Sequence, residues 1–317
     1  MSLKEEILEH DIQPKFMTTH GIFWMTAWFS CNVGLTLMNK FIFKFWRFPF
    51  PLLLSSGHMF FTALLSHIYV SNFKIEKTKL DNNNTVMKLI LFSTLSCANI
   101  AVGNMSVYLV NISLNQITRS TIPAITLVMS IFILKKSYSF DYLYSIVLLV
   151  SGVALASYGD TSLTSDGLFF NVLVCFLSAL KSVTSSQILV GSLRVDPFEL
   201  ARVVSFLSFF QMILMSWAKG EINAFLADPI YRTPEYLAIF CINGFVAFLL
   251  NIANFNFTKA TSALTVTVAG NVKHIVTILF GVLFYDSSLS NLAGLGTFLA
   301  VIGASLYART EYKHKKT

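Results

Sequence analysis

The chain has 317 residues, of which 55% are hydrophobic and only 12% are charged, and its formal net charge is +7. Together with a mean hydropathy of +0.65, this composition excludes an ordinary soluble domain and indicates a polytopic membrane protein. The basic surplus does not point to a nucleic-acid partner, because Lys and Arg fall mainly between the apolar segments, where they mark one membrane face.

A helix needs about 20 apolar residues to cross roughly 30 Å of hydrocarbon. In chain order, segments of this kind lie near residues 20–39, 50–70, 87–109, 113–134, 140–158, 167–190, 199–217, 236–255, 262–284 and 289–308. They predict an all-α membrane fold with ten transmembrane helices surrounded by membrane lipid. The connections leave no room for a soluble domain, so we expect the function to lie within the bilayer.

The two ends predict the orientation. Residues 1–19 form a polar tail that lacks the apolar core and cleavage site of a secretory signal. If this tail is cytosolic, most of the 23 Lys and Arg residues fall on the cytosolic side, as the positive-inside rule requires. An even number of spans then returns residues 309–317, the C-terminal tail, to the cytosol.

The two halves of the chain resemble each other weakly. The fifth predicted span contains Ser-Gly-Val-Ala-Leu around Gly152, and the tenth contains Ile-Gly-Ala-Ser-Leu around Gly303. A basic residue precedes each glycine at a similar distance, Arg119 in the first half and Lys273 in the second. Because each half has an odd number of spans, we expect two inverted five-helix repeats, residues 20–158 and 159–308.

Arg119, Lys181 and Lys273 lie inside apolar spans, whereas the acidic residues fall in tails, loops or span ends. A cation near mid-bilayer costs about 2.5 to 3.5 kcal/mol on insertion scales, so three of them need a functional reason. We expect them to line a wet cavity that receives an anion. Two alternatives stay open: Arg119 could snorkel to the headgroups, and Lys181 could face a polar helix interface.

Helix-breaking residues accompany two of these cations. Pro123 cannot donate to the carbonyl of Arg119, so a kink is predicted beside that side chain. Gly270 and Asn271 precede Lys273 and permit close approach of a ligand or another helix. His274 is either a ligand contact or a hydrogen-bond partner in helix packing.

Other functional classes lack the residues they need. A proton-coupled drug exporter would want an intramembrane carboxylate, and a membrane enzyme would want a nucleophile, a base or a metal cluster. The four cysteines share no close spacing, which argues against a metal site or a disulfide framework. We therefore predict a protein that is not an enzyme and needs no metal or cofactor.

Several motifs resemble those of the nucleotide-sugar and triose-phosphate transporters of the drug/metabolite transporter superfamily. Asn39-Lys40, Phe48-Pro49-Phe50-Pro51 and His58 resemble the family's N-K, F-P-Y-P and H pattern. Residues 113–123 are similar to V-S-F-x-Q-x-I-K-x-x-x-P, and 179–187 to A-x-R/K-x-V-x-x-x-Q. Residues 261–273 resemble T-S-A-L-T-x-x-V-A-G-N-x-K, the most specific match. In order and spacing, these motifs span most of the chain.

The resemblance implies a ten-helix antiporter whose substrate is a small anionic phosphorylated solute. Carried over by position, Arg119 and Lys273 would hold phosphate, with Lys181 and Lys135 as further phosphate contacts; Lys135 could equally be an interfacial anchor. The candidate contacts to sugar or base are Gln116, Asn115, Gly270, Asn271, His274, Asn251 and Lys40. Gln116 occupies the place where some members use His.

One departure bears on the substrate. Triose-phosphate translocators carry a Lys-Arg pair where this chain has Lys273-His274. This difference favours exchange of a nucleotide sugar for a nucleoside monophosphate across an endomembrane. The alternatives are a triose-phosphate-like antiporter that exchanges phosphorylated metabolites for phosphate, and a non-transporting member that acts in membrane traffic.

The last residues suggest a location. Lys313-His314-Lys315-Lys316-Thr317 resembles the dilysine signal by which coat proteins retrieve membrane proteins to the endoplasmic reticulum. A basic flank that stops transfer is the alternative interpretation. We expect a multi-pass protein of the Golgi or endoplasmic reticulum membrane, with Lys313 and Lys315 open to coat-protein recognition. The sequence is compatible with a homodimer but does not require one.

Overall fold

The computed structural model describes residues 19–75, 83–110, 112–134, 141–158, 164–191, 193–263, 265–267, 269–270, 273 and 290–314. Every regular element within these ranges is a helix. Seven helical segments among these residues are long and apolar enough to cross a membrane, and one of them, Leu114–Ile133, contains a short break. The all-α membrane class predicted from composition is therefore confirmed.

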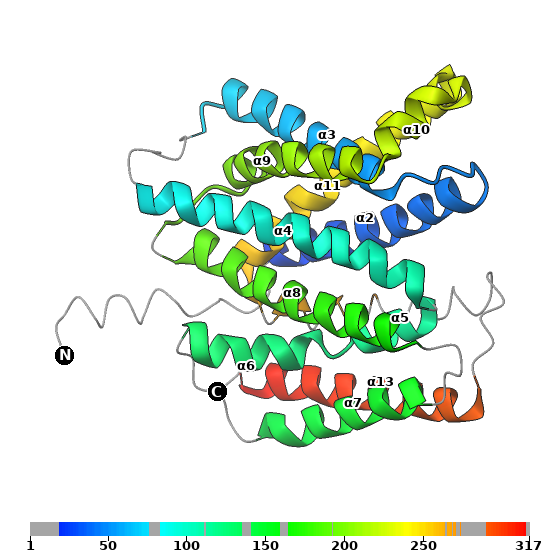
Figure 1. The fold of residues 1–317 in the computed structure, drawn as a ribbon. Coiled ribbons are helices and arrows are strands. Elements are labelled where there is room, and N and C mark those ends of the chain that lie inside the picture. The colour runs from blue at the N-terminus through cyan, green and yellow to red at the C-terminus, as the bar shows by residue number, and fades with distance from the viewer. Residues whose placement is uncertain are drawn as a thin grey trace.

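The helices run in chain order through one bundle (Figure 1). They are α2 (Thr19–Lys44), α3 (Pro51–Asn72), α4 (Asn83–Leu109), α5 (Ile112–Arg119), α6 (Ile122–Leu134), α7 (Asp141–Tyr158), α8 (Ser165–Val190), α9 (Pro197–Ala218), α10 (Glu221–Ala227), η1 (Pro229–Arg232), α11 (Pro234–Ala260) and α13 (Asn291–His314). The pair α3 and α9 forms one edge of the bundle and the pair α7 and α13 the opposite edge, with α2, α4, α8 and α11 between them.

Most predicted spans correspond to a described helix. The spans predicted at 140–158 and 289–308 coincide with α7 and α13, whose apolar stretches are Tyr142–Ala156 and Gly294–Tyr307. α13 continues to His314, so the C-terminal helix is longer than predicted. Of the span predicted at 262–284, only residues 262–263, 265–267, 269–270 and 273 are described.

The fourth predicted span is two helices rather than one kinked helix. α5 ends at Arg119 and α6 begins at Ile122. At the junction the Ser120 N–H donates to the carbonyls of Gln116 at 3.1 Å and Ile117 at 3.0 Å, and the Thr121 N–H donates to Thr118 O at 3.0 Å. Pro123 has no N–H for the Arg119 carbonyl, so the regular i to i−4 hydrogen bonding of an α-helix is interrupted at this point. The break leaves Arg119 at a helix end.

A short helical segment that the spans did not predict joins α9 to α11. Gly220 begins it with φ of 75°, a left-handed conformation that glycine adopts without steric cost. The Glu221 carboxylate that follows accepts from the Leu53 N–H at 2.8 Å and from the Ser216 hydroxyl at 3.3 Å. Since the first N–H groups of a helix lack partners within it, Glu221 caps α3 and ties α10 to it.

The contact between α7 and α13 depends on glycine. A Cβ at Gly152 would lie 2.4 Å from the backbone nitrogen of Ala300, and one at Gly296 would lie 2.3 Å from that of Ala156. Gly303 meets the backbone of Leu149 in the same way, at 2.5 Å. Because backbone atoms fill the space that a side chain would need, these helices approach as closely as small-residue membrane interfaces do.

We predict that Gly152→Ala lowers the free energy of unfolding by about 1 to 3 kcal/mol, the usual cost of overpacking. The thermal unfolding midpoint of the purified protein measures the change. Gly294→Ala is the matched control, because nothing lies within 4 Å of a Cβ built at Gly294, on the partner helix α13. Equal midpoints for the two variants would contradict this account of the α7–α13 contact.

Candidate functional site

A cavity of about 210 Å³ lies within the bundle, among α2, α4, α8, α11, the junction of α5 and α6, and the described residues of segment 266–273. Arg119, Lys181 and Lys273 all line it. The remaining lining residues are Trp28, Asn32, Asn99, Ile122, Ser178, Ser182, Ser185, Asn254, Thr258, Val266, Thr267 and Gly270. The structure thus brings the three intramembrane cations, which are far apart in the sequence, to one place.

The position of Arg119 follows from the break after α5. Its Nε donates to Asn115 Oδ1, one turn earlier, at 2.8 Å. A Cβ built at Gly103 of α4 would lie 3.3 Å from Arg119 Nη2, so the glycine makes room for the guanidinium. As the last residue of α5, Arg119 also lies at the negative end of a helix dipole, which favours a cation.

A buried amide network holds Asn115 in turn. The Asn115 Nδ2 donates to Ser106 Oγ at 2.6 Å and to Asn171 Oδ1 at 2.9 Å, and the Asn171 Nδ2 donates to Thr118 Oγ1 at 2.8 Å. Asn115 and Asn171 are both 0% exposed. The network joins α4, α5 and α8, so the guanidinium is oriented by groups that have no freedom of their own.

The two lysines reach the cavity from other helices. Lys273 Nζ donates to Asn32 Oδ1 of α2 at 3.2 Å, which links segments more than half the chain apart. Lys181 lies on α8 together with Ser178, Ser182 and Ser185, which also line the cavity. The Ser185 hydroxyl is 3% exposed and has no hydrogen-bond partner among the described residues. This hydroxyl could therefore donate a hydrogen bond to a ligand in the cavity, or accept one from it.

Asn99 completes the polar wall from α4. Its Nδ2 donates to Ser178 Oγ at 2.8 Å and to Val174 O at 3.3 Å. Its side-chain oxygen is a further acceptor, and Asn32, Asn254 and Thr258 add more amide and hydroxyl groups to the lining. Such neutral groups bond the hydroxyls of a polar solute.

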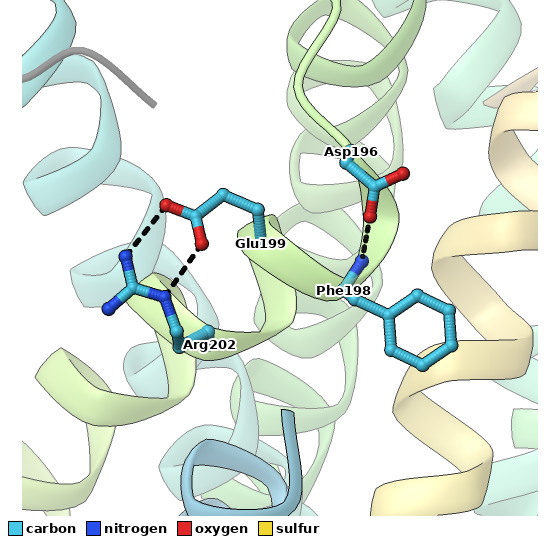
Figure 2. A network of polar contacts seen from close by, with 4 residues as sticks. All are labelled: Asp196, Phe198, Glu199 and Arg202. Carbon is cyan, nitrogen blue, oxygen red and sulfur yellow. Dashed lines mark hydrogen bonds and ion pairs between the residues drawn. The ribbon is translucent and has the colours of Figure 1, made fainter. Parts of the chain in front are cut away.

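The described lining contains no carboxylate. Of the ion pairs present, Glu199–Arg202, with atoms 2.6 Å apart, lies on α9, as Figure 2 shows. Lys259–Asp196, at 3.8 Å, joins the ends of α11 and α9. Neither pair involves a lining residue. The cavity therefore combines three basic side chains with neutral donors, an arrangement suited to binding an anion that carries more than one charge.

The other residues singled out by sequence are spread more widely. Gly270 lines the cavity, and Asn115 lies behind Arg119. Gln116 is half-buried on α5 outside the lining, and the Asn251 amide donates to Ala247 O and Thr62 Oγ1 instead. Lys40 lies on α2, where only its backbone is described. Lys135, Asn271 and His274 lie outside the described residues.

Sequence reasoning missed most of the neutral lining. Asn32, Asn99 and Asn171 carry the hydrogen bonds that hold or complement the cations, yet none was singled out. An asparagine inside an apolar span was the available signal, because a buried amide needs partners.

The described residues contain no group of three or more His, Cys, Asp or Glu side chains that could hold a metal ion. The cysteines within them are free. The chemistry on offer at the cavity is binding through charge and hydrogen bonds.

The Triose-phosphate Transporter family profile matches residues 20–308. A probable sugar phosphate/phosphate translocator of Arabidopsis thaliana is 28% identical over 94% of this chain and 99% of its own length. UDP-uronic acid transporter 1 of the same plant is 26% identical over 91% of this chain and 94% of its own, and UDP-galactose transporter 1 is 25% identical over 88% and 84%. A solved crystal structure has the same fold, with a TM-score of 0.61 at 12% identity over 93% of this chain and 97% of that one.

We predict that Asn115→Ala lowers the free energy of unfolding by about 1 to 3 kcal/mol, because it leaves buried polar partners unsatisfied. Chemical denaturation of the purified protein measures the change. Asn256→Ala is the control, since the Asn256 amide bonds only the Ile252 carbonyl of its own helix, at 2.9 Å, among the contacts described. A loss no larger than that of the control would contradict the claim that the network stabilises the fold.

Proposed function

Because this chain belongs to the Triose-phosphate Transporter family, we propose that it exchanges a nucleotide sugar for a nucleoside monophosphate across an endomembrane by alternating access. It is a multi-pass membrane transporter and not an enzyme. The observation that carries the proposal is the cavity where Arg119, Lys181 and Lys273 meet without a carboxylate in the described lining.

The proposed phosphate contacts are these three cations. Arg119 uses its Nε on Asn115, and within the described part of the chain this leaves its terminal nitrogens for a ligand. A guanidinium in that position matches two phosphate oxygens at once, whereas the lysine ammonium groups act as point charges. Hydrogen bonds to charged groups contribute about 1.5 to 3 kcal/mol each, net of the water that both partners lose.

A nucleotide sugar accounts for the neutral part of the lining better than a small phosphate ester does. Asn32, Asn99, Asn254 and Thr258 offer partners for sugar hydroxyls, and the buried Trp28 offers an apolar face for a base. The Lys273-His274 sequence, in place of the Lys-Arg pair of triose-phosphate translocators, points the same way. Two relatives are named as transporters of UDP-linked sugars.

A second candidate is exchange of a sugar phosphate for phosphate. The first relative described above is named as a probable translocator of that kind, and it aligns over 99% of its length. Both candidates need the same cations. They differ in whether the nucleoside portion of the substrate adds to binding. A non-transporting role in membrane traffic would leave the cations without a purpose.

Charge gives a reason for strict exchange. An empty cavity with three cations is costly to close off from water, while a cavity loaded with a phosphorylated solute is neutralised. Closure, and so the passage between outward and inward states, is then favoured only with a substrate bound.

We further propose that the fold consists of ten helices in two inverted repeats, residues 20–158 and 159–308. The packing of described helices supports it, because a two-fold axis relating the halves would pair α7 with α13 and α3 with α9, and these pairs are in contact. The same axis would exchange the α4–α8 contact with the α11–α2 contact, and both occur. It would also relate Arg119 to Lys273.

For location we propose the Golgi or endoplasmic reticulum membrane, with both termini in the cytosol. Lys313 is exposed near the end of α13, where a coat protein could reach it. Lys315 lies beyond the described residues. The distribution of Lys and Arg along the chain supports this orientation.

We predict that Lys273→Gln lowers exchange at least about tenfold, the loss expected for one charge-assisted hydrogen bond. Counterflow into proteoliposomes preloaded with single nucleotides, against a panel of nucleotide sugars and sugar phosphates, measures it. Lys88→Gln is the control, because Lys88 is an exposed lysine of α4 outside the cavity lining. Undiminished exchange by Lys273→Gln would refute its role, and preference for free sugar phosphates would favour the second candidate.

Arg119→Lys tests the bidentate contact. An ammonium keeps the charge but loses the planar fork and the bond from Nε to Asn115. We expect exchange to fall about tenfold or more, while the amount of folded protein in the membrane stays unchanged. Wild-type exchange would instead mean that Arg119 contributes only charge, or reaches the headgroups when substrate binds elsewhere.

A further inference from the structure

A second hollow, which we call the α3–α9 groove, lies at the edge of the bundle and shares no described residue with the cation cavity. Its volume is about 500 Å³, and it is lined by Phe60, Ala63, Leu64, His67, Arg202, Phe206, Phe209 and Phe210. Phe60, Leu64, Phe206 and Phe210 are exposed. Since both helices are membrane spans, this exposed apolar surface faces lipid tails.

Ring contacts give the register of the two helices. Tyr69 stacks on Phe198 with ring centroids 3.9 Å apart, and Phe60 contacts Phe209 at 5.7 Å. α3 and α9 are therefore antiparallel, and the end of α3 lies beside the start of α9. The groove runs from His67 and Arg202 near that membrane surface to Phe60 and Phe209 near the middle of both helices. At 1.5 Å per residue, it is about 10 Å long.

Arg202 is held at the polar end by a fixed partner. Its Nε and Nη2 donate to the two carboxylate oxygens of Glu199 at 2.6 and 2.7 Å (Figure 2). Glu199 is 0% exposed, whereas the Arg202 side chain remains 24% exposed and lines the groove. A guanidinium has five N–H groups, so this pairing leaves donors for a ligand while it fixes their direction.

We propose that the α3–α9 groove binds one anionic phospholipid, with its phosphate on Arg202 beside His67 and an acyl chain against Phe206, Phe209 and Phe210. Arg202 lies about 8 Å along α9 from Pro197, the depth at which headgroup meets acyl chain. A phospholipid joins a phosphate to an apolar chain at that depth, which matches the polar and apolar ends of the groove.

Charge selects an anionic headgroup over a zwitterionic one. The Glu199 carboxylate is buried and already accepts from Arg202, so it is closed to a choline or ethanolamine cation. Two exposed cations bracket the same end of the helix pair, Lys74 just after α3 and Arg194 just before α9. Basic residues at a membrane surface attract anionic lipids.

Native mass spectrometry of the purified full chain in detergent tests the proposal with dioleoyl phosphatidylserine and dioleoyl phosphatidylcholine. The wild type should retain one phosphatidylserine per chain in preference to phosphatidylcholine.

The double variant Glu199→Gln with Arg202→Gln removes both charges of the ion pair, so it leaves no unpaired charge buried in the protein. It should retain phosphatidylserine about tenfold less, the loss of one charge-assisted hydrogen bond. Ala63→Phe fills the groove and should reduce retention of both lipids.

Leu143→Phe is the matched control, because Leu143 is exposed on α7 at the opposite edge of the bundle. It should retain lipid as the wild type does. Equal retention of the two lipids by the wild type would overturn the proposal, as would unchanged phosphatidylserine retention in the double variant. Displacement of the lipid by millimolar inorganic phosphate would assign the site to free phosphate instead. None of these lipid-retention measurements depends on transport, so they test the lipid site independently of the proposed transport function.

Discussion

Cations inside a membrane are costly unless something compensates them, and in the described part of this protein the cavity offers no carboxylate to do so. Three features of the fold reduce the cost. Amide oxygens of Asn115 and Asn32 accept from Arg119 and Lys273, and α5 ends at Arg119 with its negative dipole end. What is left is a positive cavity, and this is why we propose that an anion binds there.

The break between α5 and α6 shows how a single residue shapes the site. Pro123 removes a backbone donor, and the helix ends where Arg119 is needed. The amide network among Asn115, Asn171 and Ser106 then ties the short helix to α4 and α8. A continuous helix would carry Arg119 without a terminus beside it. The interruption after α5 and the hydrogen bonds that hold Asn115 to α4 and α8 together orient the Arg119 guanidinium.

The sequence alone predicted the features of the fold that depend on overall composition or on a strong local signal such as a proline. The membrane class and most spans follow from hydropathy, and the disruption beside Arg119 follows from Pro123. The α10 segment was missed because it is too short to register as a span. The roles of Asn32, Asn99 and Asn171 could not be predicted, because an asparagine shows that it needs a partner but not which helix supplies it. Lys181 was left between a polar interface and the cavity for the same reason, since inward and outward faces of an apolar helix look alike.

The central claim is that the cavity recognises phosphate through its charge. Thermal unfolding of the purified protein with nucleosides and with their mono- and diphosphates, at matched concentration and ionic strength, tests it most directly. A ligand that binds only the folded state raises the midpoint in proportion to its affinity. The account predicts no shift with nucleosides and a shift that grows with the number of phosphates for at least one base. A nucleoside that stabilises the protein as strongly as its diphosphate would contradict it.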